Sequence, residues 1–411
     1  MRHFDAKKTI LQNGLTIITS NKDSDIFSIG IGIKVGSIYE DEENNGISHM
    51  LEHMLFKGTT KRNMDNLNDD LERLAGDIDI YTTYHHTVLT CNVMSNMAKD
   101  CIEIISDMLM NAVFPLKQFN LEKKVIIEEI KMSKDDPEDC SYLGLYKAAF
   151  PKSWYKYHIA GTIKSVKSIK NNTLKEFYRS YYVPNNTVIC IVSSYCHEDV
   201  IEMVECFFRD WARKDVKKLE DRNEIVSNQK VIQHKKGIGQ SHVLYGFDIQ
   251  KLDKKEEIAL ALLNKRIGAG PNSIIFKELR DKKGYAYSVY SDIDFMDNIK
   301  MFYIYAGISE ENLKNALAII DNVILKFVNG EYKIDENGIR VIKDIFLTDT
   351  VIAMESPTHI VDYMLDGELG YKDPLEYQKI LILMDSINLD DIKNVIDKVF
   401  KNPIIHVLMP K

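Results

Sequence analysis

The sequence lacks any long hydrophobic run, and no segment approaches the roughly 18 apolar residues that a membrane-spanning helix requires. The start of the chain, MRHFDAKKTILQNGLTIITS, has neither the continuous apolar core of a secretory signal nor the Arg- and Ser-rich composition of a transit peptide. We therefore expect a protein that is neither embedded in a membrane nor exported, and we predict a cytoplasmic location.

Basic charge and paired cysteines are also scarce. The chain has 61 acidic against 53 basic residues, a formal net charge of -8, and therefore no basic footprint for nucleic acid. None of its six cysteines forms a Cys-x-x-Cys pair, which argues against a disulfide framework or a cysteine metal cluster. We expect small buried thiols in a reducing compartment and no nucleic-acid partner.

The length and the order of apolar patterns predict an α+β protein of two domains. A chain of 411 residues exceeds one ordinary core, so two domains of about 200 residues are expected. TILQNGLTIITS and the segment from Ile26 to Gly36 resemble strands, and the first contains an Asn-Gly hairpin signal. Helical periods follow around residues 46–57, 65–75, 96–111 and 117–134, with the strand-like IDIYTTYHHTVLTCNV between the second and third.

The second half of the chain repeats this order. Residues 214–229 are strongly charged without a sustained apolar face, which is typical of a linker. Beyond it, the strand-like HVLYGFDI precedes the helical EEIALALLNKRIG, followed by further strands and helices in the order of the first half. We predict two homologous domains, 1–213 and 230–411, each a mostly antiparallel sheet packed with helices. The counterpart helix in the second domain has no histidine.

A short helix in the first domain carries two histidines on one face. Ile47, Met50, Leu51 and Met54 form its core stripe, while His49, Glu52 and His53 fall at i, i+3 and i+4 on another stripe. Two imidazoles one turn apart can bind a single ion, and a catalytic zinc needs a third protein ligand. Glu122 and Glu129 share a face of a later helix, so the residues alone allow either carboxylate.

The segment HMLEH fits the H-x-x-E-H signature of inverted zinc peptidases. GISHMLEHMLFKGT as a whole resembles the opening motif of the insulinase and pitrilysin family, in particular its shorter members of the bacterial type, which are related to mitochondrial processing peptidase. In that family a glutamate 76 residues after the second histidine completes the metal site, which corresponds to Glu129, although spacing alone leaves Glu128 open. The family's additional glutamate corresponds to Glu122, which would orient a metal ligand.

The resemblance extends to the second half and to the substrate. In FKELRDKKGYAYSVYS, Arg280 and Tyr287 match the family's pair that faces the metal in the closed enzyme. An extended peptide in the family adds to the edge of the active-domain sheet, where this chain has the segment Asp79, Ile80, Tyr81 and Thr82. Asp79 replaces the usual Asn, which exchanges an amide donor for an acceptor and favours basic substrate side chains.

The resemblance thus implies a zinc metalloendopeptidase that processes or degrades peptides and unfolded segments. One Zn²⁺ per site would be held by His49, His53 and Glu129, with Glu52 activating the zinc-bound water and Arg280 and Tyr287 stabilising the transition state. Family members of this length have two domains, half of a clamshell, so a homodimer or a heterodimer with a related subunit would close the chamber. The alternatives are a catalytically silent partner subunit or scaffold, and a metallohydrolase acting on a non-peptide substrate.

Overall fold

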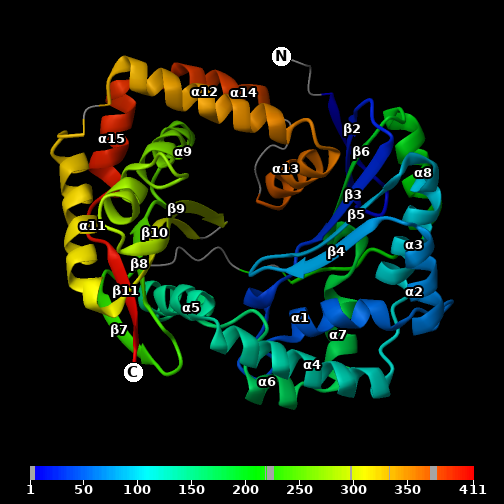
Figure 1. Ribbon diagram of the computed structural model, residues 1–411. Coiled ribbons are helices and arrows are strands. Elements are labelled where there is room, and N and C mark those ends of the chain that lie inside the picture. The colour runs from blue at the N-terminus through cyan, green and yellow to red at the C-terminus, as the bar shows by residue number, and fades with distance from the viewer. Residues whose placement is uncertain (1–4, 218, 220–225, 297–298, 333, 371–376) are drawn as a thin grey trace. The chain divides into compact units, whose positions relative to one another are not determined.

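The computed structural model describes residues 5–217, 219, 226–296, 299–332, 334–370 and 377–411 (Figure 1). Its contacts divide the chain into two compact units, and each contains segments from both halves of the sequence. The first unit is Met1–Lys131, His158–Glu220 and Ile352–Tyr377, and the second is Met132–Tyr157, Asp221–Val351 and Gln378–Lys411.

The first unit is built on a six-stranded mixed sheet in the order β1-β2-β6-β3-β5-β4. The β2–β6 pair is parallel, and the other neighbours are antiparallel. The predicted Asn-Gly hairpin joins β1 to β2, with Gly14 in the left-handed region at φ 89°. The strands are β1 (Ala6–Ile10), β2 (Thr16–Asn21), β3 (Ile26–Ile33), β4 (Asp77–Thr82), β5 (Thr87–Met94) and β6 (Thr187–Ser193).

One face of this sheet is covered by helices of the first half of the chain. Alternate residues of the strands, such as Ile29 and Ile31 of β3, join the main apolar core with the inner faces of these helices. Apart from α5, which is described below, the helices of the first half of the chain are α1 (Ile47–Met54), α2 (Met64–Arg73), α3 (Ala98–Met110), α4 (Leu116–Asp135), α6 (Ile163–Ser168), α7 (Asn171–Tyr181) and α8 (His197–Phe208).

The other face of the sheet is covered by α13 (Pro357–Leu369), which comes from the second half of the chain. A Cβ added at Gly30 of β3 would lie 2.4 Å from Val361 and 2.5 Å from Leu365 of this helix. Gly32 meets Leu369 in the same way. The two glycines therefore allow α13 to approach the backbone of β3.

The second unit repeats the topology of the first. Its five-stranded sheet has the order β7-β11-β8-β10-β9, and the β7–β11 pair is parallel like β2–β6. The remaining neighbours are antiparallel, so the sheet matches β2-β6-β3-β5-β4 strand by strand. The strands are β7 (Lys230–Lys235), β8 (Ser241–Asp248), β9 (Ala286–Met296), β10 (Ile299–Ile308) and β11 (Ile404–Pro410).

A helix from the first half of the chain packs on this second sheet. α5 (Pro137–Ala149) contacts β8 and β11, and its Gly144 lies against His406 of β11. Tyr142 of α5 also bonds Tyr290 of β9 through their hydroxyls at 2.8 Å. The other helices of the second half are α9 (Lys254–Ile267), α10 (Ile274–Phe276), α11 (Leu313–Val328), α12 (Glu336–Ala353), α14 (Tyr377–Ser386) and α15 (Leu389–Val399).

The predicted fold class is confirmed: the chain is an α+β protein with two mixed sheets packed with helices. The internal repeat predicted from the order of elements is seen in the two matching sheets. The described residues of the predicted linker, 214–217, 219 and 226–229, form no helix or strand, and the rest of it lies outside the described residues. The predicted domain limits stay a prediction.

The composition predicted neither a membrane-spanning helix nor disulfide bonds. No helix among them is long and apolar enough to cross a membrane. All six cysteines are free, and three of them are buried. The expectation of burial is wrong for Cys196 and Cys206, which are exposed.

Candidate metal centre

Helix α1 presents the two histidines because its opposite side is embedded in the core. Ile47, Met50, Leu51 and Met54 are fully buried, which fixes the rotation of the helix about its axis. His49 and His53 then lie one above the other, with ring centroids 4.7 Å apart. Their side chains keep 19% and 17% of their exposure, so a small ligand can reach them.

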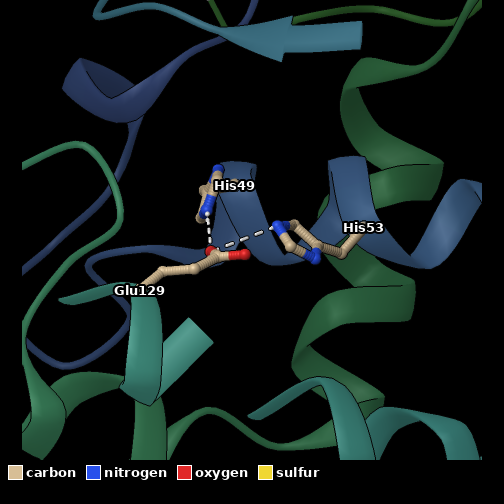
Figure 2. A group of neighbouring side chains, drawn as sticks. All are labelled: His49, His53 and Glu129. Atoms are coloured by element: carbon tan, nitrogen blue, oxygen red, sulfur yellow. Dashed lines mark hydrogen bonds and ion pairs between the residues drawn. The ribbon is translucent and has the colours of Figure 1, made fainter. Parts of the chain in front are cut away.

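Helix α4 brings one carboxylate to both imidazoles (Figure 2). Glu129 Oε2 lies 3.2 Å from His49 Nε2 and 3.5 Å from His53 Nε2. One potential ligand atom from each of these residues lies within 4.8 Å of the others. Among the described residues, this is the group of histidine, cysteine and acidic side chains that can hold a metal ion.

These distances fit a zinc ion. Ligand atoms about 2.0–2.1 Å from a tetrahedral zinc are about 3.3 Å from one another, close to the two nitrogen–oxygen distances of Glu129. Two imidazoles and one carboxylate are also a known donor set for catalytic zinc, which leaves a fourth position open. The residues therefore fit the metal that the motif predicts.

The electrostatics of the group favour a positive charge. Burial lowers the pKa of His49, but hydrogen bonds and charge from Glu129 and Glu52 outweigh it and raise the pKa to about 9. The hydrogen bond from His49 in turn lowers the pKa of Glu129, against a smaller effect of burial. A proton on His49 thus occupies a place that a metal cation would fill, and metal binding would release it.

Glu122 contacts a histidine at the nitrogen that faces away from Glu129. Its Oε2 lies 3.0 Å from His53 Nδ1, and its Oε1 lies 2.9 Å from Lys57 Nζ. The helix face predicted from the sequence therefore places both of its glutamates at the histidines, in different positions. Glu128, which spacing left open, points elsewhere: its side chain is 66% exposed and bonds Lys131 at 2.7 Å.

Glu52 lies beside the group and is held by the edge strand of the sheet. Its Oε2 accepts a hydrogen bond of 2.7 Å from Thr82 Oγ1 and lies 3.3 Å from His49 Nδ1. Thr82 ends β4, the last strand in the sheet order, together with the predicted substrate residues Asp79, Ile80 and Tyr81. Asp79 and Tyr81 are exposed, whereas Ile80 packs on the core.

Arg280 and Tyr287 lie in the second unit and contact each other there. Arg280 is in the π-helix Lys277–Asp281, and Tyr287 is near the start of β9. The guanidinium carbon lies 4.8 Å from the ring centre of Phe276 and 5.2 Å from that of Tyr287, so it is held by two cation–π contacts. Tyr287 is 79% exposed, and the role of the pair stays a prediction.

Sequence reasoning missed three features around this group. Lys57 stands one turn after His53, so the helical period could have placed it beside the same partner. Thr82 was expected to touch substrate, and no sequence signal linked its hydroxyl to Glu52. Glu40 is a buried carboxylate that bonds the start of α1. In the sequence nothing distinguishes it from the acidic residues that follow it.

The fold and the His–His–Glu group together define a protein of two similar units with a metal-binding motif in the first. Two family models match: one described as insulinase (peptidase family M16) over residues 15–163, and one described as the peptidase M16 inactive domain over residues 168–344. The chain belongs to the peptidase M16 (insulinase) family, as the resemblance of the motif implied.

Curated relatives of similar length carry matching names. An uncharacterized zinc protease of Streptomyces coelicolor is 26% identical over 412 residues, which covers 98% of this chain and 89% of the relative. The uncharacterized zinc protease YmxG of Bacillus subtilis is 29% identical over 319 residues, 77% of each chain.

Solved structures show the same fold. The crystal structure of a protease from Helicobacter pylori matches with a TM-score of 0.91 at 21% identity and covers 100% of both chains. A structure described as a peptidase M16 inactive domain, from Pseudomonas fluorescens, matches with a TM-score of 0.88 at 18% identity, covering 99% of this chain and 98% of that one.

Proposed function

We propose that this chain is a zinc metalloendopeptidase in which His49, His53 and Glu129 hold one Zn²⁺ and Glu52 is the general base. The observation that carries the proposal is the single Glu129 oxygen that lies near Nε2 of both histidines, with Glu52 next to them. The names of the curated relatives, zinc proteases, support the same chemistry.

The mechanism assigns each side chain a task. Zinc in such a site lowers the pKa of water to about 7 and polarises a carbonyl group. Glu52 takes a proton from the water that attacks the scissile carbonyl and returns it to the leaving amine. Thr82 donates to the Glu52 oxygen that also lies near His49, which fixes the direction in which the carboxylate accepts the proton.

The substrate is proposed to be an extended peptide or unfolded segment that pairs with the free side of β4. Main-chain pairing at a sheet edge tolerates varied sequences, whereas neighbouring side chains set preference. The exposed Asp79 lies on this strand. Burial, followed by the negative charges of Asp366, Asp362 and Asp79, raises the pKa of the Tyr81 hydroxyl to about 12. This acidic edge favours peptides with basic side chains.

The remaining part of the proposal is a chamber shared by two chains, a homodimer or a heterodimer with a related subunit. Arg280 and Tyr287 of one chain would then donate to the substrate or the developing oxyanion at the zinc of the other. Mixing a Glu52→Gln chain with an Arg280→Ala chain tests this sharing. Recovered activity supports it, and a mixture as inactive as either chain alone contradicts it.

The central experiment uses the full chain, a mixture of unrelated peptides and a metal chelator. Cleavage should disappear with chelator and return with zinc, and Glu52→Gln should lower kcat by about 10²–10⁴-fold while zinc stays bound. Glu43→Gln is the matched control, since Glu43 is an exposed acid of the preceding loop. Bound zinc without cleavage of any peptide would favour the silent-partner alternative, and cleavage of small esters alone would favour a non-peptide hydrolase.

A further inference from the structure

Glu40 is a buried carboxylate that holds the start of the metal-binding helix. It follows the short helix Ser37–Tyr39 and is only 5% exposed. Its Oε2 accepts hydrogen bonds from the backbone N–H of Gly46 at 2.7 Å and from Asn45 Nδ2 at 2.9 Å. Its Oε1 accepts the backbone N–H of Ser48 at 2.9 Å.

These bonds provide the cap that α1 lacks. The first N–H groups of a helix have no partner within the helix, and its N-terminus attracts negative charge. The N-cap residue of α1 is Gly46, which has no side chain to offer, so a carboxylate from an earlier segment takes that role. Burial raises the pKa of Glu40 to about 7, and the hydrogen bonds of Gly46, Ser48 and Asn45 oppose this rise. The start of the helix thus offsets part of the cost of burying the charge of Glu40.

On its other side, the first turn of α1 packs tightly against the backbone of residues 160–161. Gly46 has φ 96°, and a Cβ there would lie 2.6 Å from the carbonyl oxygen of Ala160. A Cβ on Gly161 would lie 2.3 Å from the carbonyl oxygen of Asn45. The first turn of α1 is therefore held between the Glu40 carboxylate and residues 160–161.

Because α1 is short, the position of its first turn affects the positions of both histidines. The N–H that Glu40 Oε1 accepts belongs to Ser48, the residue directly before His49, and the helix has only eight residues. A metal site requires its ligand distances to lie within about 0.2 Å of their ideal values. A small shift of this first turn would move both imidazoles relative to Glu129, which lies on a different helix.

We propose that Glu40 is a positioning residue that sets the place of α1 and thereby the affinity of the chain for zinc. The inference rests on the proposed function, because it takes His49, His53 and Glu129 as the zinc ligands. It assigns a role in metal binding to a residue that contacts neither the metal nor the substrate.

The test compares Glu40→Gln with Glu43→Gln in the full chain. Gln at position 40 would turn an NH₂ group toward N–H donors, so at least one of the three bonds is lost. Zinc affinity, measured by competition with a chromophoric chelator, should fall by about 10- to 100-fold for Glu40→Gln, the usual effect of losing a group that orients a ligand. Glu43→Gln removes the same charge from an exposed position and should leave zinc affinity unchanged.

The thermal midpoint of the zinc-free chains, measured alongside, separates positioning from a purely structural role. A Glu40→Gln chain with a lower midpoint and the zinc affinity of the wild type overturns the inference. If Glu40→Gln does not fold, Glu40→Asp retains the charge on a shorter side chain, and unchanged zinc affinity in that variant overturns the inference equally. A wild-type chain that binds no zinc contradicts the proposed function itself, which keeps the two failures distinct.

Discussion

His53 Nδ1 lies 3.0 Å from Glu122 Oε2, and the other oxygen of this carboxylate lies 2.9 Å from Lys57 Nζ. A proton on Nδ1 that is donated to Glu122 leaves the lone pair of Nε2 directed at the metal position. Lys57, in turn, holds the carboxylate in this orientation through its ion pair. We therefore expect Glu122 to control the tautomer of His53, although it is not among the three candidate ligand residues.

Replacing Glu122 by Gln should weaken zinc binding by about 10- to 100-fold, because the amide holds the imidazole less firmly and no longer attracts its proton as strongly. Glu128→Gln on the same helix is the control, since this side chain is 66% exposed and pairs with Lys131. Competition with a chelator measures both affinities. Equal zinc affinity in the two variants would contradict the role given to Glu122.

Helix α1 could be predicted because the residues that indicate it are close together in the sequence. The spacing of His49, Glu52 and His53 on one stripe, beside a fully apolar stripe, determines both the helix and its orientation in the core. The third ligand is a longer-range question. Glu122 and Glu129 share one helix face, and residue patterns cannot say which of them meets which imidazole nitrogen. The family spacing favours Glu129 as the third ligand, and the structure shows which nitrogen each carboxylate contacts.

Hydrophobic periodicity could not predict that α5 and α13 each pack on the sheet formed by the other half of the chain. An amphipathic pattern shows that a helix such as α5 or α13 is half-buried, but not which sheet it covers. The repeated glycines of IGIGI in β3 were a usable sign, because glycine within a strand often marks close approach of another element.

Gly30→Ala should destabilise the protein by about 1–3 kcal/mol, because the added methyl group overlaps Val361 and Leu365 of α13. The free energy of unfolding from urea titration measures the loss. Gly239→Ala is the control, since no atom lies within 4 Å of a Cβ at that position. Combining Gly30→Ala with Val361→Ala should restore part of the loss relative to the sum of the single variants, and strict additivity would argue against this contact.

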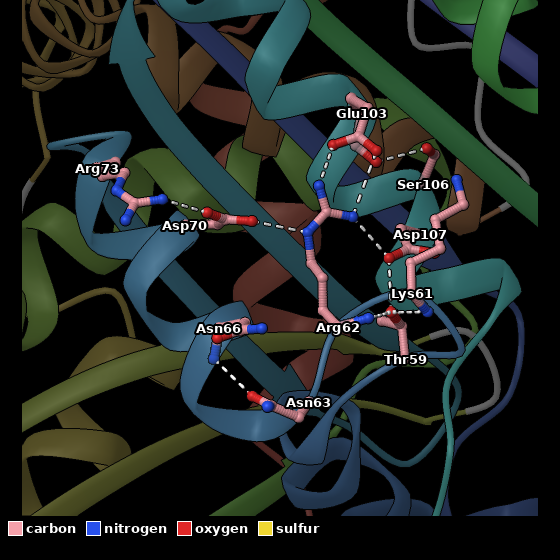
Figure 3. A network of polar contacts seen from close by, with 10 residues as sticks. All are labelled: Thr59, Lys61, Arg62, Asn63, Asn66, Asp70, Arg73, Glu103, Ser106 and Asp107. Atoms are coloured by element: carbon pink, nitrogen blue, oxygen red, sulfur yellow. Dashed lines mark hydrogen bonds and ion pairs between the residues drawn. The ribbon is translucent and has the colours of Figure 1, made fainter.

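Arg62 joins the segment after α1 to helices α2 and α3 (Figure 3). Its guanidinium bonds Asp70 at 2.8 Å, Glu103 at 2.5 Å and Asp107 at 2.7 Å. The side chain of Asp107 is only 1% exposed, so its charge depends on Arg62 and on the hydrogen bonds of Thr59 and Asn111.

Arg62→Gln should therefore lower the free energy of unfolding by about 3 kcal/mol, the usual cost of leaving a buried charge without its partner. Arg73 offers a matched control, because it bonds the same Asp70 at 2.8 Å but is 73% exposed, and Arg73→Gln should change stability by less than about 1 kcal/mol. Urea titration of both variants gives the comparison. Similar losses in the two would show that burial of Asp107 does not govern the contribution of Arg62.

The buried carboxylate of Glu40 predicts a specific dependence of stability on pH in the zinc-free protein. Its pKa is raised from 4.5 to about 7, mainly by burial, against the opposing hydrogen bonds. Between these two values the folded chain holds a proton that the unfolded chain has released, so stability falls as the pH rises and levels off above pH 7. The shift corresponds to about 3 kcal/mol in total.

The difference in unfolding free energy between the wild type and Glu40→Gln, measured from pH 5 to pH 8, isolates this contribution from other titrating groups. As the pH rises, the wild type should lose stability relative to Glu40→Gln. A difference that stays constant would show that Glu40 titrates in the folded chain as it does in water, and a difference that moves the other way would contradict a raised pKa.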